Sequence, residues 1–333
     1  MQNRRIVVTE RGGPDVLKVV EEQLPEPGPD EVRLKVLAAG VSAFDLMVRH
    51  GSFPGFPKPP FTPGCDVVGI VDQLGDKVST LDPGQMVAGG PFFEGGYSEY
   101  LCLPAEGLVP VPDGVDPAEA VCLVANYLTA HLEMHGVARV KSGERVLIHG
   151  AAGGVGSALL ELGRMAGLEM YGTASKHNHE FVSSMGATPI DYRAEDFVER
   201  VRALTGEGVD VVFDPIGGGR QLWRSYRALR KGGRLVWFGV AASSKAGMKV
   251  IPASFFTRLA LSLLPDGKHA PLTPNAGKVE QAETLADLLD LLAAGKINPE
   301  IAERIPLEDA VRAHEFLEQG GYRGKWSWSP TTE

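Results

Sequence analysis

Arg145-Val-Leu-Ile-His-Gly-Ala-Ala-Gly-Gly-Val-Gly-Ser157 is the stretch of sequence that decides the fold of this chain. Its apolar run Val146–Ile148 predicts a buried strand, and the glycine-dense segment Gly150–Gly156 predicts a tight turn. A helix is expected next, because apolar residues recur at the helical spacing of about 3.6 residues, at Val155, Leu159, Leu162 and Met165. A strand, a glycine turn and a helix in this order predict a site for the diphosphate of a dinucleotide.

The glycine pattern departs from the usual G-x-G-x-x-G. It reads Ala151-x-Gly153-x-x-Gly156, with alanine in the first position, and such a pattern alone also suits an ordinary glycine-rich loop. Glycine lets the backbone come close to phosphates, and the free N–H groups at the helix start face the anion. We therefore expect cofactor contacts from Ala152, Gly153, Gly154 and Val155, the last three through backbone N–H groups.

Apolar strands and helical segments alternate after the glycine turn. We expect strands at 168–173, 188–192, 209–214 and 234–239, with helices at 180–185, 195–205 and 220–230. Alternation of this kind predicts an α/β fold with right-handed βαβ units and a doubly wound parallel sheet. Ligands of such sheets bind at the carboxyl ends of the strands, where Asp214, Gly239 and Val240 lie.

The end of the second strand bears on the choice of cofactor. Sites selective for NAD place Asp or Glu there, to accept from the ribose hydroxyls. Here the strand ends in Gly172-Thr-Ala-Ser-Lys-His-Asn-His179, and no carboxylate appears before Glu180. The hydroxyl, ammonium and imidazole groups of this segment suit a phosphate dianion. The alternative is that the segment is an ordinary solvated polar loop. We predict NADPH rather than NADH, with 2′-phosphate contacts from Ser175 and Lys176, and with less support from Asn178, His179 and Tyr192.

Length and composition limit the class of protein. The chain has 333 residues, which is enough for two domains, and an ordinary globular composition with 44% hydrophobic and 23% charged residues. The net charge of −9 argues against nucleic-acid and anionic membrane partners. The first residues lack the apolar core of a signal peptide, no apolar run could span a membrane, and the three cysteines do not form a disulfide framework. We expect a cytoplasmic enzyme.

The first part of the chain has a different pattern. Short strands separated by Pro, Gly and Asp turns are expected at 6–9, 16–23, 32–39, 67–73, 85–88 and 98–103. This pattern predicts a β-rich, partly open barrel. The chain ends with expected helices at 279–294 and 307–319 and a strand at 325–329. We expect a first domain at 1–125, completed by 276–333, and a nucleotide-binding domain at 126–275, with the substrate cleft between them.

These motifs together resemble a known superfamily, the medium-chain dehydrogenases/reductases, and within it the zinc-independent quinone oxidoreductases. The resemblance covers nearly the whole chain, and the Gly172–Tyr192 region is similar to the synaptic vesicle membrane protein homologue branch. Its marks are Gly40-Val-Ser-Ala-Phe-Asp45, Pro63-Gly-Cys-Asp-Val-Val-Gly69, Asn126-Tyr-Leu-Thr-Ala130, the glycine turn, Asp214-Pro-Ile-Gly-Gly218 and Gly324-Lys325. It implies a GroES-like catalytic domain, a Rossmann NADP-binding domain and commonly a homodimer.

The resemblance also bears on metal. The catalytic zinc ligands of the zinc-dependent relatives correspond here to Ser42, Cys65 and Ala125. Because a catalytic zinc needs about three protein donors, we expect no zinc, and the cysteines of a structural zinc lobe are missing as well. His131 and His135 are four residues apart and could bind a metal from one helix face, but surface histidines are the better interpretation.

Several site residues follow from the resemblance, each with a structural alternative. Thr129 is expected near the nicotinamide ribose or amide, or else caps a helix. Lys325 is expected near the cofactor, or else is an exposed terminal lysine. Candidate catalytic residues are Ser42, Asp45 and Tyr127, with Asn126 as a further donor. Ser42 and Asp45 could equally cap the helical turn that follows them, and many quinone reductases have Asn where Ser42 stands.

The chemistry expected without a metal is hydride transfer to a conjugated acceptor. A quinone or an α,β-unsaturated carbonyl compound delocalises the developing charge, whereas alcohol oxidation would need a Lewis acid or base. Loop aromatics could line an apolar pocket, or merely anchor their loops; they are Phe53, Phe56, Phe61, Phe92, Phe93, Phe255 and Phe256. The alternatives are an enoyl-thioester reductase, which would need a basic rim for the pantetheine phosphates, and a non-catalytic protein that binds NADPH.

Overall fold

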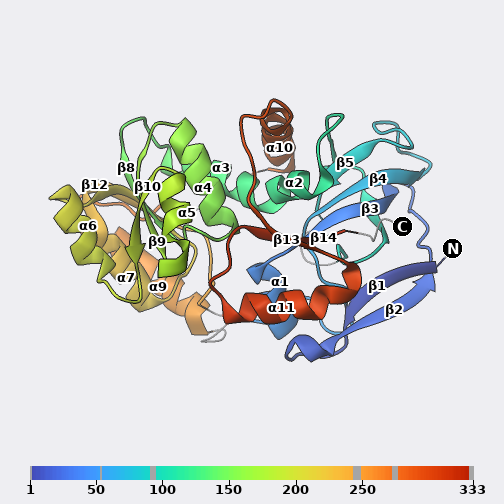
Figure 1. Cartoon of the computed structure of the whole chain (residues 1–333), viewed down its shortest axis with the longest axis horizontal. Helices are drawn as coiled ribbons and strands as arrows, with labels where there is room; N and C mark the ends of the chain where they lie inside the picture. Colours follow the sequence, from blue (N-terminus) through green and yellow to red (C-terminus); the bar gives the residue numbers. More distant parts are fainter. Residues whose placement is uncertain (1, 53–54, 91–94, 243–248, 272–276, 330–333) are drawn as a thin grey trace. The chain divides into compact units, whose positions relative to one another are not determined.

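The computed structural model describes residues 2–52, 55–90, 95–242, 249–271 and 277–329, and the chain forms two compact units (Figure 1). Unit 1 comprises Met1–Leu128 and Ala276–Glu333, and unit 2 comprises Thr129–Asn275. The sequence places these boundaries at 125/126 and 275/276. The first division falls within the short helix α3 (Leu128–His131), which lies between two wider π-helical stretches, Leu123–Tyr127 and Leu132–Ala138.

Unit 2 is built on a five-stranded sheet in the order β10-β9-β8-β11-β12, and all of its strand pairs are parallel. The predicted doubly wound parallel sheet is therefore confirmed. Its strands are β8 (Arg145–His149), β9 (Glu169–Ala174), β10 (Ala187–Asp191), β11 (Val209–Asp214) and β12 (Leu229–Trp237). The chain steps from β8 outward to β10, then returns past β8 to β11, so the topological switch point lies between β8 and β11.

The crossover helices of unit 2 follow from this order. They are α4 (Gly154–Met165), α5 (His179–Ser184), α6 (Phe197–Thr205) and α7 (Gly219–Ala228). Right-handed connections place α4 and α5 on one face of the sheet and α6 and α7 on the other. Asp196 caps α6, because its side chain accepts hydrogen bonds from Val198 N and Glu199 N.

Two features of unit 2 differ from the sequence analysis. The strand expected at 234–239 begins earlier, at Leu229, and ends at Trp237. It pairs with β11 at Leu229, bulges around Gly232, whose φ is 80°, and pairs again from Arg234 to Trp237. Helix α9 (Val250–Ser262) was not expected at all. Its apolar residues occur on all sides, so it lacks the single apolar stripe by which a helix is recognised.

Unit 1 combines two β-sheets. A two-stranded sheet pairs β1 (Gln2–Val8) with β2 (Leu17–Gln23). A seven-stranded sheet has the order β13-β14-β3-β4-β5-β7, with β6 paired to β3, and only β13 and β14 run parallel. Its strands are β3 (Glu31–Val41), β4 (Val67–Leu74), β5 (Met86–Gly89), β6 (Tyr100–Pro104), β7 (Val109–Pro110), β13 (Ile301–Ile305) and β14 (Lys325–Trp328). The predicted β-rich domain is confirmed, and β7 and β13 are additions.

Segments from both ends of the chain build the core of unit 1. Its helices are α1 (Ala43–His50), α2 (Pro117–Cys122), α10 (Lys278–Ala293) and α11 (Ala310–Gln319), with short helical turns at Pro14–Val16 and Leu307–Asp309. Trp326 and Trp328 of β14 are buried in one apolar cluster with Val36 and Val41 of β3. The C-terminal segment therefore completes the first domain through its core.

The loop aromatics have different surroundings. Phe56 and Phe61 are buried in the core of unit 1, where they anchor their loops. Phe255 and Phe256 of α9 are instead exposed. Phe53, Phe92 and Phe93 lie outside the described residues.

Candidate cofactor and substrate site

The glycine turn joins β8 to α4 at the carboxyl edge of the parallel sheet. Gly150 has a φ of 65°, and the Gly153 N–H donates to the Gly150 carbonyl oxygen at 2.9 Å. A Cβ on Gly156 would overlap that same carbonyl oxygen, so only glycine lets α4 begin so close to the turn. The turn therefore has the close backbone approach that a diphosphate site requires.

The backbone donors of the turn differ from the expected set. The Gly153 N–H was expected to meet the diphosphate, but it is already engaged with Gly150. Gly153 instead caps α4, whose first turn contains Gly154, Val155 and Gly156. The first N–H groups of a helix have no acceptor within it, so those three amides are donors available to an anion, and the expected contact from Ala152 stays a prediction.

The unusual Ala151 has a structural explanation in the neighbouring strand. Ala151 is fully buried, and its N–H donates to the Thr173 carbonyl oxygen of β9. A Cβ on Gly172 would lie 2.7 Å from the Ala151 Cβ. Glycine at 172 therefore provides the space that alanine in the first position of the motif takes up.

A buried polar chain runs beneath the turn. His149 Nδ1 lies 3.1 Å from Thr173 Oγ1, and His149 Nε2 lies 3.1 Å from Ser225 Oγ on α7. Ser225 Oγ donates to Asp214 Oδ2 at 2.6 Å, so His149 donates from Nε2 and accepts at Nδ1. Burial lowers the pKa of His149, against the opposing effect of Asp214, and the imidazole is neutral at pH 7. The Gly150 N–H donates to Thr173 Oγ1 at 3.3 Å, which links this chain to the turn.

Asp214, at the carboxyl end of β11, is the last member of this series of hydrogen-bonded side chains. Its side chain is fully buried, and Oδ1 accepts from the backbone N–H groups of Ile216 and Gly217 at 2.9 and 3.0 Å. Oδ2 accepts from Ser225 and Gln221. These contacts keep the carboxylate in the interior, so Asp214 acts on any ligand only through the loop that it positions.

Gly239 and Val240 follow β12 next to the same loop. Both are half-buried, and a Cβ on Gly239 would overlap the Pro215 carbonyl oxygen. The Ala241 N–H donates to that oxygen at 3.0 Å. The glycine turn, the Asp214 loop and Gly239–Val240 thus lie along one edge of the sheet. Thr129, also in unit 2, is half-buried in α3.

The expected 2′-phosphate residues lie at the ends of β9 and β10. Ala174 pairs with Asp191, which brings the residues that follow each strand to the same edge. Ser175 and Asn178 are largely buried and Lys176 is exposed, whereas Tyr192 is 50% exposed. Arg193 was missed by the sequence analysis. Its Nε donates to Tyr192 Oη at 3.3 Å, and its guanidinium lies 5.5 Å from the Tyr192 ring centroid. Arg193 is a cation two residues beyond the end of β10, a position that the sequence analysis did not consider.

Ser42 and Asp45 of unit 1 form a capping pair at the start of α1. Asp45 Oδ2 accepts from Ser42 N and Ser42 Oγ, each at 2.8 Å, and Asp45 Oδ1 accepts from Gly64 N at 3.1 Å. Burial raises the pKa of Asp45 to about 6, Asp66 adds to the shift, and Ser42 and Lys325 oppose it. Asp45 is fully buried while Ser42 is half-buried, so the carboxylate positions the hydroxyl.

Lys325 lies in the interior of unit 1. Its ammonium forms a buried ion pair with Asp66, and the two side chains are 2% and 0% exposed. The alternative of an exposed terminal lysine is therefore wrong. Asp66 also accepts from Gly40 N at 3.1 Å, and a Cβ on Gly40 would overlap the lysine side chain. Burial alone would lower the pKa of Lys325, but Asp66, Cys65 and Cys122 outweigh it and hold this pKa above its ordinary value.

Two thiols, Cys65 and Cys122, lie near Lys325. Burial, with Asp66 and Asp45 in addition, raises the pKa of Cys65 well above its usual range, and burial raises the pKa of Cys122 to about 12. Within the described part of the chain, no group of three His, Cys, Asp or Glu residues could hold a metal ion. The rings of His131 and His135 do share a helix face, with centroids 4.6 Å apart.

Asn126 and Tyr127 occupy the π-helical stretch of unit 1. Their exposed fractions are 7% and 2%, so both polar groups are largely withdrawn from solvent. π-Helical turns often occur at functional sites.

Comparisons with known proteins agree with this architecture. Residues 28–113 match the family model described as alcohol dehydrogenase GroES-like domain, and residues 185–326 match the model described as zinc-binding dehydrogenase. Mouse quinone oxidoreductase is 32% identical over 330 residues, which cover 97% of this chain and 96% of the mouse protein. The chain belongs to the quinone oxidoreductase family of medium-chain dehydrogenases/reductases. The predicted GroES-like and Rossmann domains are thereby confirmed.

Other members of this superfamily are similar over nearly the whole chain. The human synaptic vesicle membrane protein VAT-1 homolog is 32% identical over 338 residues, which cover 97% of the present chain and 85% of the human protein. A mycobacterial protein solved in complex with NADPH has a TM-score of 0.86 and 31% identity, covering 98% and 100% of the two chains. The CurK enoyl reductase has a TM-score of 0.84 and 26% identity, covering 99% and 100%.

Proposed function

We propose that this protein is an NADPH-dependent reductase that transfers hydride to a quinone or to an α,β-unsaturated carbonyl compound. The observation that carries the proposal is the glycine turn at the switch point of the sheet, where Gly154, Val155 and Gly156 offer unengaged backbone donors. Quinone oxidoreductases of similar length support the oxidoreductase activity.

NADPH fits the residues of unit 2. The diphosphate would lie on the first turn of α4, and Ser175, Lys176, Asn178 and Tyr192 would surround the 2′-phosphate, now joined by Arg193. Gly239, Val240 and Thr129 would flank the nicotinamide. The reduced nicotinamide, when bound, supplies the hydride. The NADPH complex of the mycobacterial relative supports the same cofactor.

The residues of unit 1 would serve the substrate. Ser42 is our candidate donor to the substrate oxygen that gains negative charge, and it would do so by turning its single hydroxyl proton from Asp45 Oδ2, which accepts it in this structure, to the substrate. Lys325 would act on the cofactor side as a buried cation held by Asp66. Tyr127 and Asn126 are further candidate donors. All of these assignments are tested by substitution, with KM and kcat measured separately.

A substrate panel tests the function. NADPH oxidation is followed at saturating concentrations of a naphthoquinone, an alkenal and a crotonyl thioester, and calorimetry measures binding of NADPH and NADH. We expect turnover of a conjugated acceptor and tighter binding of NADPH than of NADH. Binding of NADPH without turnover of any acceptor would favour the non-catalytic alternative, and absence of NADPH binding to folded protein would refute the proposal.

Zinc independence is a separate part of the proposal. Of the three positions that correspond to the catalytic zinc ligands of the zinc-dependent relatives, Ser42, Cys65 and Ala125, only Cys65 has a side chain that commonly binds zinc, whereas a catalytic zinc needs about three protein donors. We expect elemental analysis of the purified protein to find less than stoichiometric zinc, and EDTA to leave the activity unchanged. Stoichiometric zinc that EDTA removes together with activity would contradict this.

Assembly and location are proposed from family resemblance and composition. We expect a homodimer, which sedimentation velocity at micromolar concentration would detect, and a cytoplasmic location, which fractionation would detect. No helix among the described residues has the length and apolar character needed to cross a bilayer. The net charge of −9 is the reason to expect no nucleic-acid partner.

A further inference from the structure

Four buried polar side chains connect the glycine turn to the loop that follows β11. They are Thr173 on β9, His149 on β8, Ser225 on α7 and Asp214 on β11, and none of them is more than 2% exposed. Consecutive members of this buried series lie 3.1, 3.1 and 2.6 Å apart. The three strands are neighbours in the sheet, so the series crosses the middle of unit 2 beneath the proposed cofactor site.

Every hydrogen bond of the buried series points in the same direction. A carboxylate oxygen can only accept, so the Ser225 hydroxyl donates to Asp214 and its oxygen accepts from His149 Nε2. Nδ1 of the neutral ring then accepts from the Thr173 hydroxyl, whose oxygen accepts from the Gly150 N–H at 3.3 Å. Hydrogen bonds aligned head to tail in a protein interior strengthen one another. A change at one end is therefore expected to reach the other end.

The imidazole of His149 is also held from the side. The Phe197 ring meets it edge-on, with centroids 4.7 Å apart and an interplanar angle of 76°. The Arg224 guanidinium lies 4.4 Å from the Phe197 centroid and pairs with Asp196 at 3.0 Å. This packing fixes the plane of the imidazole, so its two nitrogens stay directed at their partners.

One end of the buried series holds the glycine turn. The Thr173 hydroxyl oxygen accepts from Gly150 N, and its carbonyl oxygen accepts from Ala151 N at 3.0 Å. The Gly150 carbonyl oxygen accepts from Gly153 N, and it is the atom that a Cβ on Gly156 would overlap. The position of Gly150 therefore determines where α4 and its free amides begin.

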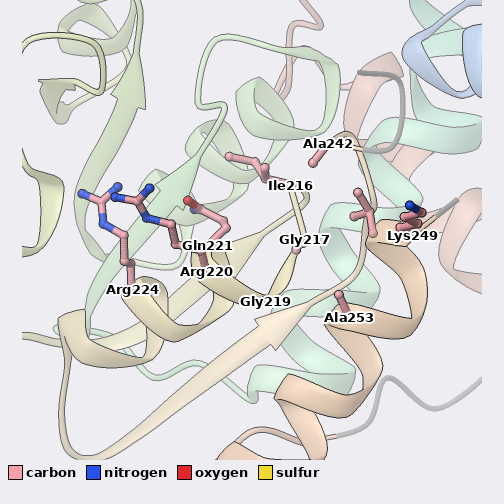
Figure 2. A pocket seen from close by; sticks show the side chains of 11 residues that line it. Ile216, Gly217, Gly219, Arg220, Gln221, Arg224, Ala242, Lys249 and Ala253 are labelled. Atoms are coloured by element: carbon pink, nitrogen blue, oxygen red, sulfur yellow. The ribbon is translucent and has the colours of Figure 1, made fainter. Parts of the chain in front are cut away.

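The other end holds the loop after β11. Asp214 Oδ1 accepts from the N–H groups of Ile216 and Gly217. The Ile216 carbonyl oxygen accepts from Ala242 N at 3.0 Å, which ties the loop to the segment that follows β12. Ile216, Gly217 and Ala242 line one pocket of about 620 Å³ (Figure 2). Asp214 therefore supports the segments next to the proposed nicotinamide position.

We propose that His149 is a positioning residue for cofactor binding, which couples the diphosphate turn to the loop beside the nicotinamide so that both segments bind NADPH as a unit. The inference rests on the proposed function and adds to it a coupling between two ends of the cofactor site. His149 acts only through Thr173 and Ser225. Segments that are already held in place lose less conformational freedom on binding, so the affinity for the cofactor is expected to depend on the buried series.

Binding of a cofactor fragment tests the coupling. Calorimetry measures binding of NADPH and of 2′-phospho-ADP-ribose, which lacks the nicotinamide, to the full-length protein. Ser225→Ala breaks the buried series next to Asp214, at the end far from the diphosphate turn. We nevertheless expect it to weaken binding of 2′-phospho-ADP-ribose about tenfold, which corresponds to the loss of one buried hydrogen bond. An unchanged affinity for this fragment would overturn the proposal.

A double-mutant cycle tests whether the buried series acts as a unit. Thr173→Val removes the hydroxyl at the other end with little change of volume, and it is also expected to weaken binding about tenfold. Thr173→Val/Ser225→Ala should bind about as well as either single variant, because one break already ends the coupling. Additive losses, about a hundredfold in total, would indicate two independent contacts and overturn the proposal.

Two control variants separate positioning from stability. Thr173→Ser keeps the hydroxyl but loses a buried methyl group, so it is expected to lower stability in urea and to retain affinity. Thr205→Val removes a hydroxyl that donates to Val201 O and accepts from Gly208 N, at the opposite edge of the sheet. It is expected to bind as the wild type does. Affinity that followed stability across these variants would show a purely structural network and overturn the proposal.

The direction of the hydrogen bonds has its own spectroscopic test. Nitrogen-15 NMR of the imidazole, assigned by comparison with His149→Gln, should show the neutral form protonated at Nε2, with and without NADPH. Protonation at Nδ1 would reverse the direction and overturn the proposal. A wild type that binds no NADPH would refute the proposed function together with this inference. Additive or absent effects in a wild type that does bind NADPH would refute this inference alone.

Discussion

Asp45, Asp66 and Lys325 are buried ionisable residues of unit 1, none of them more than 3% exposed. Lys325 and Asp66 neutralise each other, whereas Asp45 depends on hydrogen bonds from Ser42 and Gly64. Sequence motifs selected Asp45 and Lys325 as candidates. Their burial could not be deduced from the sequence, because it arises where β3, β14 and the loop before β4 pack together. These side chains allow two predictions at the scale of single residues.

Asp45 makes stability depend on pH. Its pKa is about 6 in the fold and about 3.9 in an unfolded chain, so the folded state binds more protons between these values and loses stability as pH rises through them. Relative to Asp45→Asn, the wild type is expected to lose about 3 kcal/mol between pH 3.5 and 7. Urea unfolding of both proteins across this range measures the difference. Parallel curves would show that Asp45 ionises normally.

Lys325→Met is expected to destabilise the fold by about 3–5 kcal/mol, because it leaves the Asp66 carboxylate buried without its partner. The double variant Asp66→Asn/Lys325→Met removes both charges and should recover part of this loss, since the asparagine oxygen can still accept from Gly40 N. Urea unfolding at pH 7 provides the free energies. If the double variant were less stable than Lys325→Met alone, the ion pair would not be the source of the effect.

At the scale of elements, the strongly patterned segments were the predictable ones. β11 was predicted with its observed limits, Val209–Asp214, because a buried central strand is a continuous apolar run between turns. α9 and β13 were missed, because one is apolar on all sides and the other is short and partly exposed. The network from Thr173 through His149 to Asp214 was also missed, since it joins β9, β8, α7 and β11 across the sheet.

Gly172→Ala tests how β9 and the glycine turn fit together. The new Cβ would lie 2.7 Å from the Ala151 Cβ and 3.0 Å from Val182 Cγ1, so overpacking should cost about 1–3 kcal/mol. Adding Ala151→Gly removes the closer of these contacts and is expected to restore part of the stability. Gly136→Ala is the control, because its Cβ would have no heavy atom within 4 Å. Unfolding midpoints in urea compare the four proteins.

At the scale of the whole molecule, the proposed cofactor contacts and the candidate substrate residues belong to different units. All proposed contacts to the diphosphate and 2′-phosphate lie in unit 2, while Ser42, Asp45 and Lys325 lie in unit 1. The sequence places the boundaries through changes in pattern, from short strands and turns to alternating strands and helices. It also suggests the return of the C-terminal segment to unit 1, which β14 makes by pairing with β3.

NADPH is expected to stabilise the protein, because a ligand that binds only the folded state adds about 2.7 kcal/mol at a hundred times its Kd. Thermal unfolding with NADPH should show a rise of several degrees in Tm. NADH at the same concentration should give a smaller rise, because it lacks the phosphate that the β9 and β10 ends are expected to bind. Equal shifts with both nucleotides would contradict the assignment of Ser175 and Lys176.

The sequence alone determined the two domain types, the parallel order of the central elements and the place of the dinucleotide turn. These depend on local patterns: the period of apolar residues and glycine at turns and at close backbone contacts. Tertiary structure decided which N–H groups of the turn remain free, that Lys325 is buried with Asp66, and that the side chains from Thr173 to Asp214 form one hydrogen-bonded series. Each of these depends on residues distant in sequence, whose burial and pairing exist only once the chain has folded.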